Sequence, residues 1–271
     1  MTRQFTITWA LFVTLTLLLA GLASPGFAAE EQADDGPEAA TPEATQPQTG
    51  KSDPEASCGT TDAEGEADQA EAKPQWKSLF DGKQLGKWKS TKFGGEGKVE
   101  VRDGMIVMPC GSDMTGITYT GKPPRENYEL KLQGKRLDGS DFFCTTTFPV
   151  GKDYCSLVVG GWGGTVVGLS SVDYYDASDN LTTNFMTFKD DVWYDVRIRV
   201  SKHRISAWIG DKQMVNQIRE GHKFDIRFEV DPSRPLGIST WQTGGAVRAI
   251  EIRDLTPEEI AADVVKEDEV Y

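Results

Sequence analysis

The chain has 271 residues, a formal net charge of −13 and a hydrophobic fraction of 38%. Neither this charge nor any local run of Lys and Arg supplies the concentrated basic face that nucleic-acid binding requires. The chain has only two histidines, with no Cys-x-x-Cys or His-x-x-x-His spacing, which argues against a transition-metal site. We therefore expect no nucleic-acid partner, no metal and no cofactor. A hard-cation site formed by Asp173, Asp176 and Asp179 is the alternative that the sequence leaves open.

The first 28 residues follow the order of a secretory signal peptide. Arg3 precedes an apolar run from Trp9 to Leu22, and small residues then lead to Ala28. The apolar run is short for a membrane span. We expect cleavage after Ala28, a periplasmic or extracellular location and no membrane span in the mature protein; an uncleaved anchor is the alternative.

Two acidic segments flank the central part of the chain. Residues 29–75 contain 13 acidic and 2 basic residues and almost no large apolar side chain, a composition typical of a disordered linker. Residues 258–271 form a second acidic segment, a C-terminal tail with 6 acidic residues and 1 basic residue. Residues 76–257 carry nearly equal numbers of acidic and basic side chains and are long enough for one folded domain.

Period-two alternation of apolar residues predicts strands throughout this domain. Residues 99–108 contain an Asp103-Gly104 pair, which fits a type I′ hairpin that places Val101 opposite Ile106. Further alternating runs occupy residues 128–132, 195–200, 204–210 and 249–255. With turn residues between them and no helical repeat before Thr256, they predict an all-β sandwich.

The start of a short helix is indicated near the end of the domain. Thr256 is a suitable N-cap, Pro257 suits the first helical turn, and two glutamates follow at favourable positions for a helix N-terminus. We expect this helix to be peripheral.

Four cysteines leave the disulfide pattern open. Cys144 and Cys155 flank a hairpin whose tip we expect at 149–151, which would place them opposite each other and allow a disulfide in an exported protein. Two buried free thiols are the alternative. A bond between Cys58 and Cys110 is a further possibility that the sequence does not decide.

Three motifs give the domain a family resemblance. Residues 76–88, WKSLFDGKQLGKW, resemble the opening signature of the 3-keto-disaccharide hydrolase domain family. Residues 99–107 are similar to the next hairpin of that family, and residues 247–255 to its last strand. The resemblance implies a jelly-roll β-sandwich of the concanavalin A-like lectin and glucanase type, and an activity on 3-keto-glycosides.

The middle of the domain departs from the family pattern. Family members often carry a Glu-x-Gln strand and a Gln-x-His-Gly turn, whereas the corresponding regions here are residues 156–161 and 241–245, without that glutamate and histidine. The family's polar site residues therefore have no direct match in these two regions.

Two tryptophans stand beside glycine pairs. Trp162 lies within Gly160-Gly161-Trp162-Gly163-Gly164, and Trp241 is followed by Gln242, Thr243 and two more glycines. Missing side chains could clear space around each indole and leave a flat apolar platform for a sugar ring. The alternative is that the glycines mark strand bends and the tryptophans fill the core.

Three acidic residues near these motifs are catalytic candidates. The ketone of a 3-keto sugar acidifies the neighbouring C–H, so one base and one electrophile are enough to begin elimination of the glycosidic oxygen. Candidate bases are Asp173, Asp176 and Asp141. Each of them is alternatively a turn residue, and Asn180-Leu181-Thr182 in the same region matches a glycosylation sequon.

Groups for binding and charge stabilisation complete the hypothesis. Lys152 or Arg248 would stabilise developing negative charge, while Tyr174 and Gln242 would contact the sugar beside the two tryptophans. The sequence thus predicts an exported hydrolase or lyase acting on a carbohydrate substrate. A non-catalytic carbohydrate-binding module is the alternative.

Overall fold

The computed structural model describes residues 75–266. The predicted signal peptide (1–28), the linker except for its last residue, and the last five residues of the acidic tail lie outside the described residues. Within 75–266, no helix is both long and apolar enough to cross a membrane.

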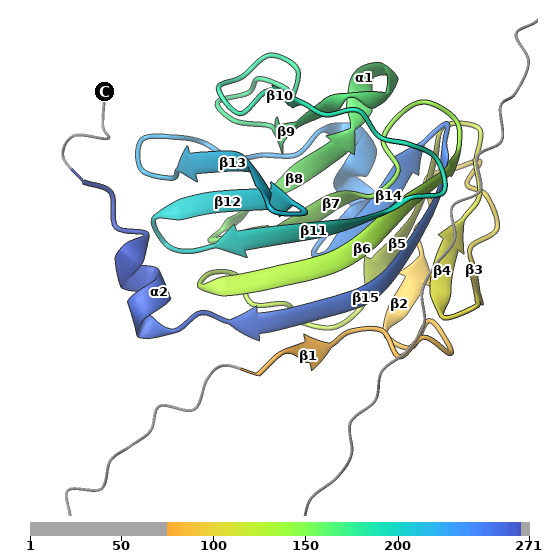
Figure 1. Cartoon of the computed structure of the whole chain (residues 1–271), viewed down its shortest axis with the longest axis horizontal. Helices are drawn as coiled ribbons and strands as arrows, with labels where there is room; N and C mark the ends of the chain where they lie inside the picture. The colour runs from red at the N-terminus through yellow and green to blue at the C-terminus, as the bar shows by residue number, and fades with distance from the viewer. Residues whose placement is uncertain (1–74, 267–271) are drawn as a thin grey trace, which may run out of the picture. The chain divides into compact units, whose positions relative to one another are not determined.

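Two antiparallel sheets packed face to face form the domain, which confirms the predicted jelly-roll sandwich (Figure 1). In spatial order, sheet A contains β13 (Lys212–Ile218), β12 (Arg204–Ile209), β11 (Trp193–Val200), β6 (Tyr128–Asp138), β15 (Gly244–Asp254), β4 (Met105–Met108) and β3 (Glu100–Arg102), with β1 (Lys77–Ser78) also paired to β15. Sheet B contains β10 (Asn184–Phe185), β9 (Val166–Ser170), β8 (Asp153–Gly160), β7 (Thr145–Val150), β14 (Gly237–Trp241), β5 (Met114–Tyr119) and β2 (Trp88–Ser90).

The core lies between the two sheets. Alternate residues of each strand enter it, as in β8, where Leu157 and Val159 are fully buried in the central cluster while Ser156 and Val158 point to the opposite face. This alternation is the reason that the sequence pattern predicts a sandwich. It also leaves each sheet with an outer face, and the outer face of sheet B carries the candidate site.

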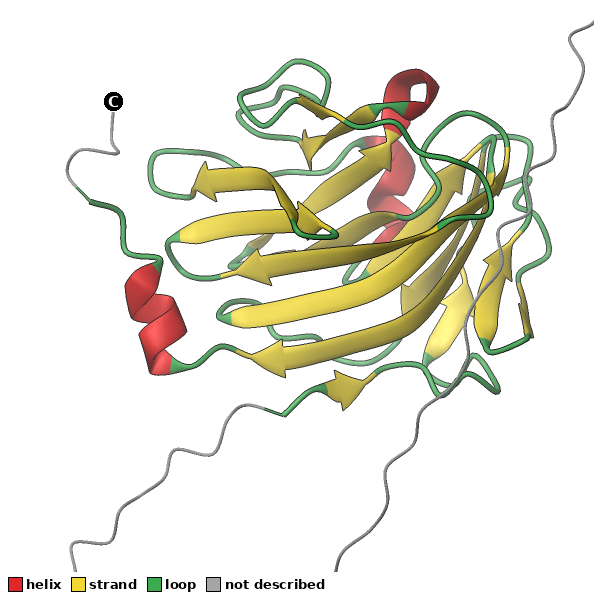
Figure 2. Cartoon of the chain, viewed as in Figure 1, coloured by secondary structure: helices red, strands yellow, loops and turns green. Residues whose placement is uncertain are grey.

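Local predictions at one hairpin turn and one helix are confirmed. Val101 pairs with Ile106, and Asp103 and Gly104 have φ values of 50° and 75°, as a type I′ hairpin requires. Helix α2 (Pro257–Ala262) begins with a capping box in which Thr256 and Glu259 bond each other's backbone N–H. The first residues of the predicted acidic tail therefore belong to α2, which is one of the few helical segments in Figure 2.

The predicted disulfide is wrong because the hairpin turns two residues later than expected. Val150 pairs with Asp153, so the tip is Gly151-Lys152, and Cys155 lies opposite Phe148. Cys144 and Cys155 are buried free thiols. Burial raises the pKa of the Cys155 thiol to about 12 and raises that of Cys144 as well, so both are protonated and unreactive at neutral pH.

Candidate functional site

The glycine-rich segment around Trp162 is a turn between β8 and β9. It includes the one-turn element α1 (Gly161–Gly164), whose Trp162 and Gly163 have left-handed backbones with φ of 48° and 84°. Gly160 and Gly164 also have positive φ. These glycines reverse the chain without steric cost, and they leave Trp162 44% exposed on the outside of sheet B. Trp162 therefore does not fill the core.

Asp141 holds this turn to the neighbouring loop. One of its carboxylate oxygens accepts a hydrogen bond from the backbone N–H of Gly163 at 3.1 Å, and the other accepts one from the N–H of Phe142 at 2.8 Å. The N–H of Asp141 donates in turn to Thr243 Oγ1 at 3.0 Å.

Trp241 and Phe142 form an aromatic pair at the end of β14. Their ring centroids are 6.5 Å apart at an interplanar angle of 42°. The backbone N–H of Trp241 donates to the backbone carbonyl of Phe142 at 3.1 Å. Met114, Ile226 and Val230 pack with them in a small apolar cluster separate from the main core. These residues give the outer face of sheet B an apolar floor.

A charged pair stands beside this floor. Arg227, just before the 3₁₀-helix η1 (Phe228–Ser233), donates two hydrogen bonds to the Glu229 carboxylate, at 2.7 and 3.1 Å. Arg227 also donates to Asp176, whose second oxygen accepts from Ser170 Oγ at 3.4 Å. Arg227 therefore joins two carboxylates that lie 53 residues apart in the sequence.

Electrostatics keep the pair ionised. Partial burial on its own would raise the pKa of Glu229, but the hydrogen bonds and positive charge of Arg227 outweigh it and lower that pKa below its ordinary value. Hydrogen bonding to Glu229 raises the pKa of Arg227. At neutral pH the site thus holds a carboxylate and a guanidinium side by side.

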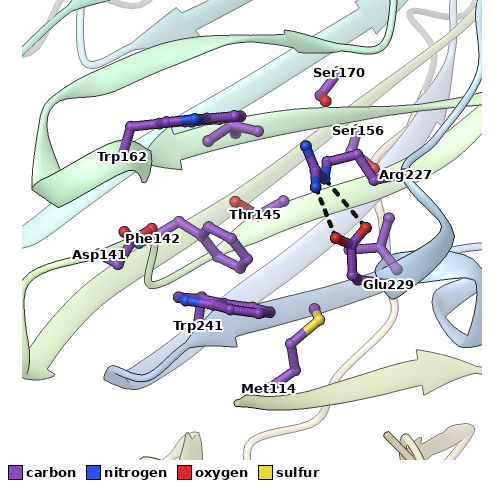
Figure 3. Close-up of a pocket in the computed structure, with 12 residues that line it drawn as sticks. Met114, Asp141, Phe142, Thr145, Ser156, Trp162, Ser170, Arg227, Glu229 and Trp241 are labelled. Atoms are coloured by element: carbon purple, nitrogen blue, oxygen red, sulfur yellow. Dashed lines mark hydrogen bonds and ion pairs between the residues drawn. The ribbon is translucent and has the colours of Figure 1, made fainter. Parts of the chain in front are cut away.

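These groups line one cleft of about 260 Å³. Figure 3 shows Trp162 on one side, Phe142 and Trp241 on the other, and the Arg227–Glu229 pair at the end. The complete lining is Met114, Asp141, Phe142, Thr145, Ser156, Val158, Trp162, Ser170, Arg227, Glu229, Val230 and Trp241. Aromatic walls, three hydroxyl groups and one ion pair suit a ligand with apolar ring faces and polar edges.

Four of the residues predicted from the sequence lie in or next to the cleft. Trp162, Trp241 and Asp141 line it, and Asp176 contacts it through Arg227. Gln242 is exposed beside Trp241, where its side-chain amide donates to Asp113 at 3.3 Å.

Asp173 and Tyr174 lie on a neighbouring loop outside the cleft lining. The Asp173 carboxylate accepts from the Lys223 backbone N–H at 2.8 Å and contacts His222 Nδ1 at 2.6 Å, and these two contacts lower its pKa. Tyr174 is 74% exposed and bonds Lys223 Nζ. Asp173 is therefore a weak base that joins two loops.

Lys152 and Arg248 are also outside the cleft lining. Lys152 forms the tip of the β7–β8 hairpin. Arg248 belongs to β15 in sheet A, stacks on Trp193 at 4.1 Å and donates to Gln133 at 2.7 Å. Neither of them contributes a charge to the aromatic cleft.

The loop that follows β9 is organised by Asn180. Its side-chain amide donates to the carbonyls of Leu169, Tyr175 and Asp176 at 2.8 to 3.0 Å, and its carbonyl accepts from Thr182. Within residues 75–266, no group of three His, Cys, Asp or Glu side chains could hold a metal ion.

Arg227 and Glu229 were not identified from the sequence. They lie in residues 223–230, where apolar and charged residues alternate as in a strand, but no glycine signal marks them as a site, and only folding brings this segment next to β8 and β14. An Arg-x-Glu triplet on an exposed loop is common, so the sequence offered no signal that distinguished it.

The domain is an antiparallel jelly roll with an aromatic cleft on the outer face of one sheet. The model of the 3-keto-alpha-glucoside-1,2-lyase-like domain matches residues 75–253, and the chain belongs to this family. A search of curated protein sequences finds no match.

Several solved structures are similar to this chain at low sequence identity. Carbohydrate binding module CBM66 from Bacillus subtilis is 8% identical over 62% of this chain and 96% of its own, with a TM-score of 0.41. Domain 4 of the arabinanase AbnA from Geobacillus stearothermophilus is 15% identical over 66% and 88%, with a TM-score of 0.42. The Crh5 transglycosylase is 13% identical over 68% and 85%, with a TM-score of 0.46.

Proposed function

We propose that the chain cleaves 3-keto-glycosides by elimination in the cleft between Trp162 and Trp241. The observation that carries this proposal is the position of the Arg227–Glu229 ion pair at the end of an aromatic cleft (Figure 3). Membership of the 3-keto-alpha-glucoside-1,2-lyase-like family supports the substrate class.

In the proposed complex the sugar ring lies between the aromatic walls. Axial C–H groups face the indoles, and the hydroxyls of Thr145, Ser156 and Ser170 bond the polar edge of the sugar. Arg227 donates to the oxygen at C3, where negative charge develops. The electrophile proposed from the sequence is thus Arg227, in place of Lys152 or Arg248.

Glu229 is the proposed base. Its carboxylate takes the proton from C2, the electron pair forms the C2–C3 enolate, and the enolate then expels the oxygen at C1 to give a C1–C2 double bond. The proton on Glu229 passes to the leaving oxygen, which restores the carboxylate. Addition of water across the new double bond would complete a hydrolysis.

The ion pair explains how a weakly basic carboxylate could act. In the free site both Glu229 oxygens accept from Arg227, which lowers the basicity of Glu229. A ketone oxygen that recruits Arg227 would weaken these bonds and so raise the basicity of Glu229 when substrate is present. Asp176 would keep the guanidinium in place during this exchange.

Turnover of a chromogenic 3-keto-α-glucoside tests the proposal. Glu229→Gln is expected to reduce kcat by about 10² or more, because base catalysis is lost while the shape is kept. The matched control is Asp173→Asn, which removes a carboxylate outside the cleft lining and is expected to leave kcat within about threefold. Loss of turnover in Asp173→Asn with normal turnover in Glu229→Gln would overturn the assignment.

A carbohydrate-binding module is the second candidate, and one observation favours it. Both oxygens of Glu229 and of Asp141 already accept hydrogen bonds from this chain. If the chain is a carbohydrate-binding module, the wild type would bind a sugar with no turnover of any 3-keto-glycoside.

Export remains part of the proposal. The order of charged, apolar and small residues before Ala29 is the supporting feature. N-terminal sequencing of the mature protein from its native host should begin at Ala29, and an intact Met1 terminus would contradict export by cleavage.

A further inference from the structure

The aromatic walls of the cleft come from three segments that are distant in the sequence. Phe142 follows β6, Trp162 occupies the β8–β9 turn, and Trp241 ends β14. Their relative positions depend on contacts between these segments, such as the bond from the backbone N–H of Trp241 to the Phe142 carbonyl.

Asp141 is bonded to all three segments. Its carboxylate accepts from the N–H groups of Phe142 and Gly163, and its own N–H donates to Thr243, two residues after Trp241. The Trp241 N–H then donates to the Phe142 carbonyl. Asp141 thus connects the three segments through the backbone N–H groups of Phe142 and Gly163 and the hydroxyl of Thr243.

The turn that carries Trp162 pairs with β9 through a Gly161–Val166 bridge and bonds the segment after β6 through the Gly163 N–H. Three of its glycines and Trp162 itself have positive φ, and glycine-rich backbone loses the most conformational freedom on ordering. The turn is closed on itself by a bond from the Thr165 N–H to the Gly161 carbonyl at 3.2 Å, which does not fix it to the cleft floor. The bond from Gly163 to Asp141 does so.

We infer that Asp141 is a positioning residue that fixes Trp162 over the cleft, and that it does not act as a base. Its two oxygens accept from backbone N–H groups of two segments, which a substrate cannot recruit as it could recruit the Arg227 side chain that bonds Glu229, so the Asp141 carboxylate serves to link these segments. This inference rests on the proposed function for its kinetic consequence, while its structural consequence is independent of turnover.

Asp141→Asn is the variant that tests the inference. The amide keeps the size of the side chain but replaces one acceptor by an NH₂ group that faces a backbone N–H. We expect KM for the 3-keto-glycoside to rise about tenfold and kcat to change less than threefold, because a loosened wall weakens binding of substrate and transition state equally.

A fluorescence measurement reports on the wall without substrate. Acrylamide quenching of Trp162, taken as the difference between each protein and the same protein with Trp162→Phe, should increase in Asp141→Asn. Asp138→Asn is the matched control, because Asp138 accepts from the Gly244 N–H at 2.9 Å in the same region but does not bond the Trp162 turn. Its Trp162 quenching should equal that of the wild type.

Three outcomes decide the inference. Unchanged quenching in Asp141→Asn, or a kcat that collapses with KM unchanged, would overturn it. A wild type with no turnover would remove the proposed function, yet the quenching comparison would still test the positioning role. If Asp141→Asn does not fold, Asp141→Glu replaces it with the charge retained, and the same increase in quenching and the same split between KM and kcat are expected.

Discussion

Tryptophan rings on the outer faces of the two sheets differ in what covers them. On sheet A, the rings of Trp76, Trp193 and Trp208 are each covered by a cation of this chain: Lys131 at 4.1 Å, Arg248 at 4.1 Å and Arg197 at 3.9 Å respectively. On sheet B, no cation of residues 75–266 stacks on Trp162 or Trp241, and both rings line the cleft.

This difference separates tryptophans that stabilise from those available to a ligand. A ring face covered by a guanidinium or ammonium group has lost the surface on which a sugar would stack. A ring face that borders a cleft has kept it. The composition of a sequence does not distinguish the two cases; for Trp208, the residue opposite it on the neighbouring strand, Arg197, does.

A buried charge network accompanies the covered tryptophans of sheet A. Glu129 is 1% exposed, and its carboxylate pairs with Arg197 at 2.9 Å, with Arg199 at 3.7 Å and with Arg253. Arg253 and Arg199 also pair with Glu259 of α2, so the network attaches the C-terminal helix to the sheet.

The largest effect is expected from Glu129→Gln. The neutral amide leaves three arginines without their buried counter-charge, so the free energy of unfolding should fall by about 3 to 5 kcal/mol. Urea denaturation measures it. Glu251→Gln is the control, because its pair with Lys131 is partly exposed and is worth less than about 1 kcal/mol. Equal losses in the two variants would show that the buried network has no special role.

A pair of tryptophan variants tests the comparison directly. Trp162→Ala should weaken sugar binding by about 2 kcal/mol, because it removes a central aromatic anchor, and should leave the stability nearly unchanged. Trp208→Ala should do the reverse, because Arg197 loses its stacking partner. Calorimetric titration of both variants measures the free energy of sugar binding, and thermal melting measures their stability. A stability loss in Trp162→Ala without a binding effect would remove the aromatic cleft as a ligand site.

A smaller effect is expected from the pH dependence of α2. Hydrogen bonding from Arg253 is the main cause that lowers the pKa of Glu259 from 4.5 to about 2. A carboxyl with a lowered pKa stabilises the folded state fully above its unfolded value, and this contribution is lost as pH falls from about 4.5 toward 2. Glu259→Gln should therefore cost about 1 to 2 kcal/mol at pH 7 and almost nothing at pH 2. A pH-independent cost would assign the effect to the capping box alone.

Local signals in the sequence were sufficient for much of the fold. Asp103-Gly104 predicted the hairpin register, and Thr256 with Pro257 predicted the start of α2, because each structure depends on neighbouring residues. The Cys144–Cys155 hairpin shows the limit. The predicted turn lay two residues too early, which placed Cys155 opposite Cys144 although its partner in the structure is Phe148, four residues later. Nothing in the local sequence excluded the earlier turn.

The site could be predicted only in part for a similar reason. Trp162 and Trp241 carried a glycine signal that reflects the turn and strand end where they lie. Arg227 and Glu229 carry none, since their position beside the cleft results from long-range packing of the segment after β13. Arg248 looked equally suitable in sequence and lies on sheet A.

Asn180 has a consequence for producing this protein in other hosts. Its amide nitrogen donates to three carbonyls of the loop that carries Asp176, so the nitrogen that a glycosyltransferase would modify is already used in the fold. A glycan attached there during secretion would separate the loop from β9 and, through Asp176, release Arg227. Protein made in a glycosylating host should accordingly be recovered either unmodified at Asn180 or with a disordered cleft.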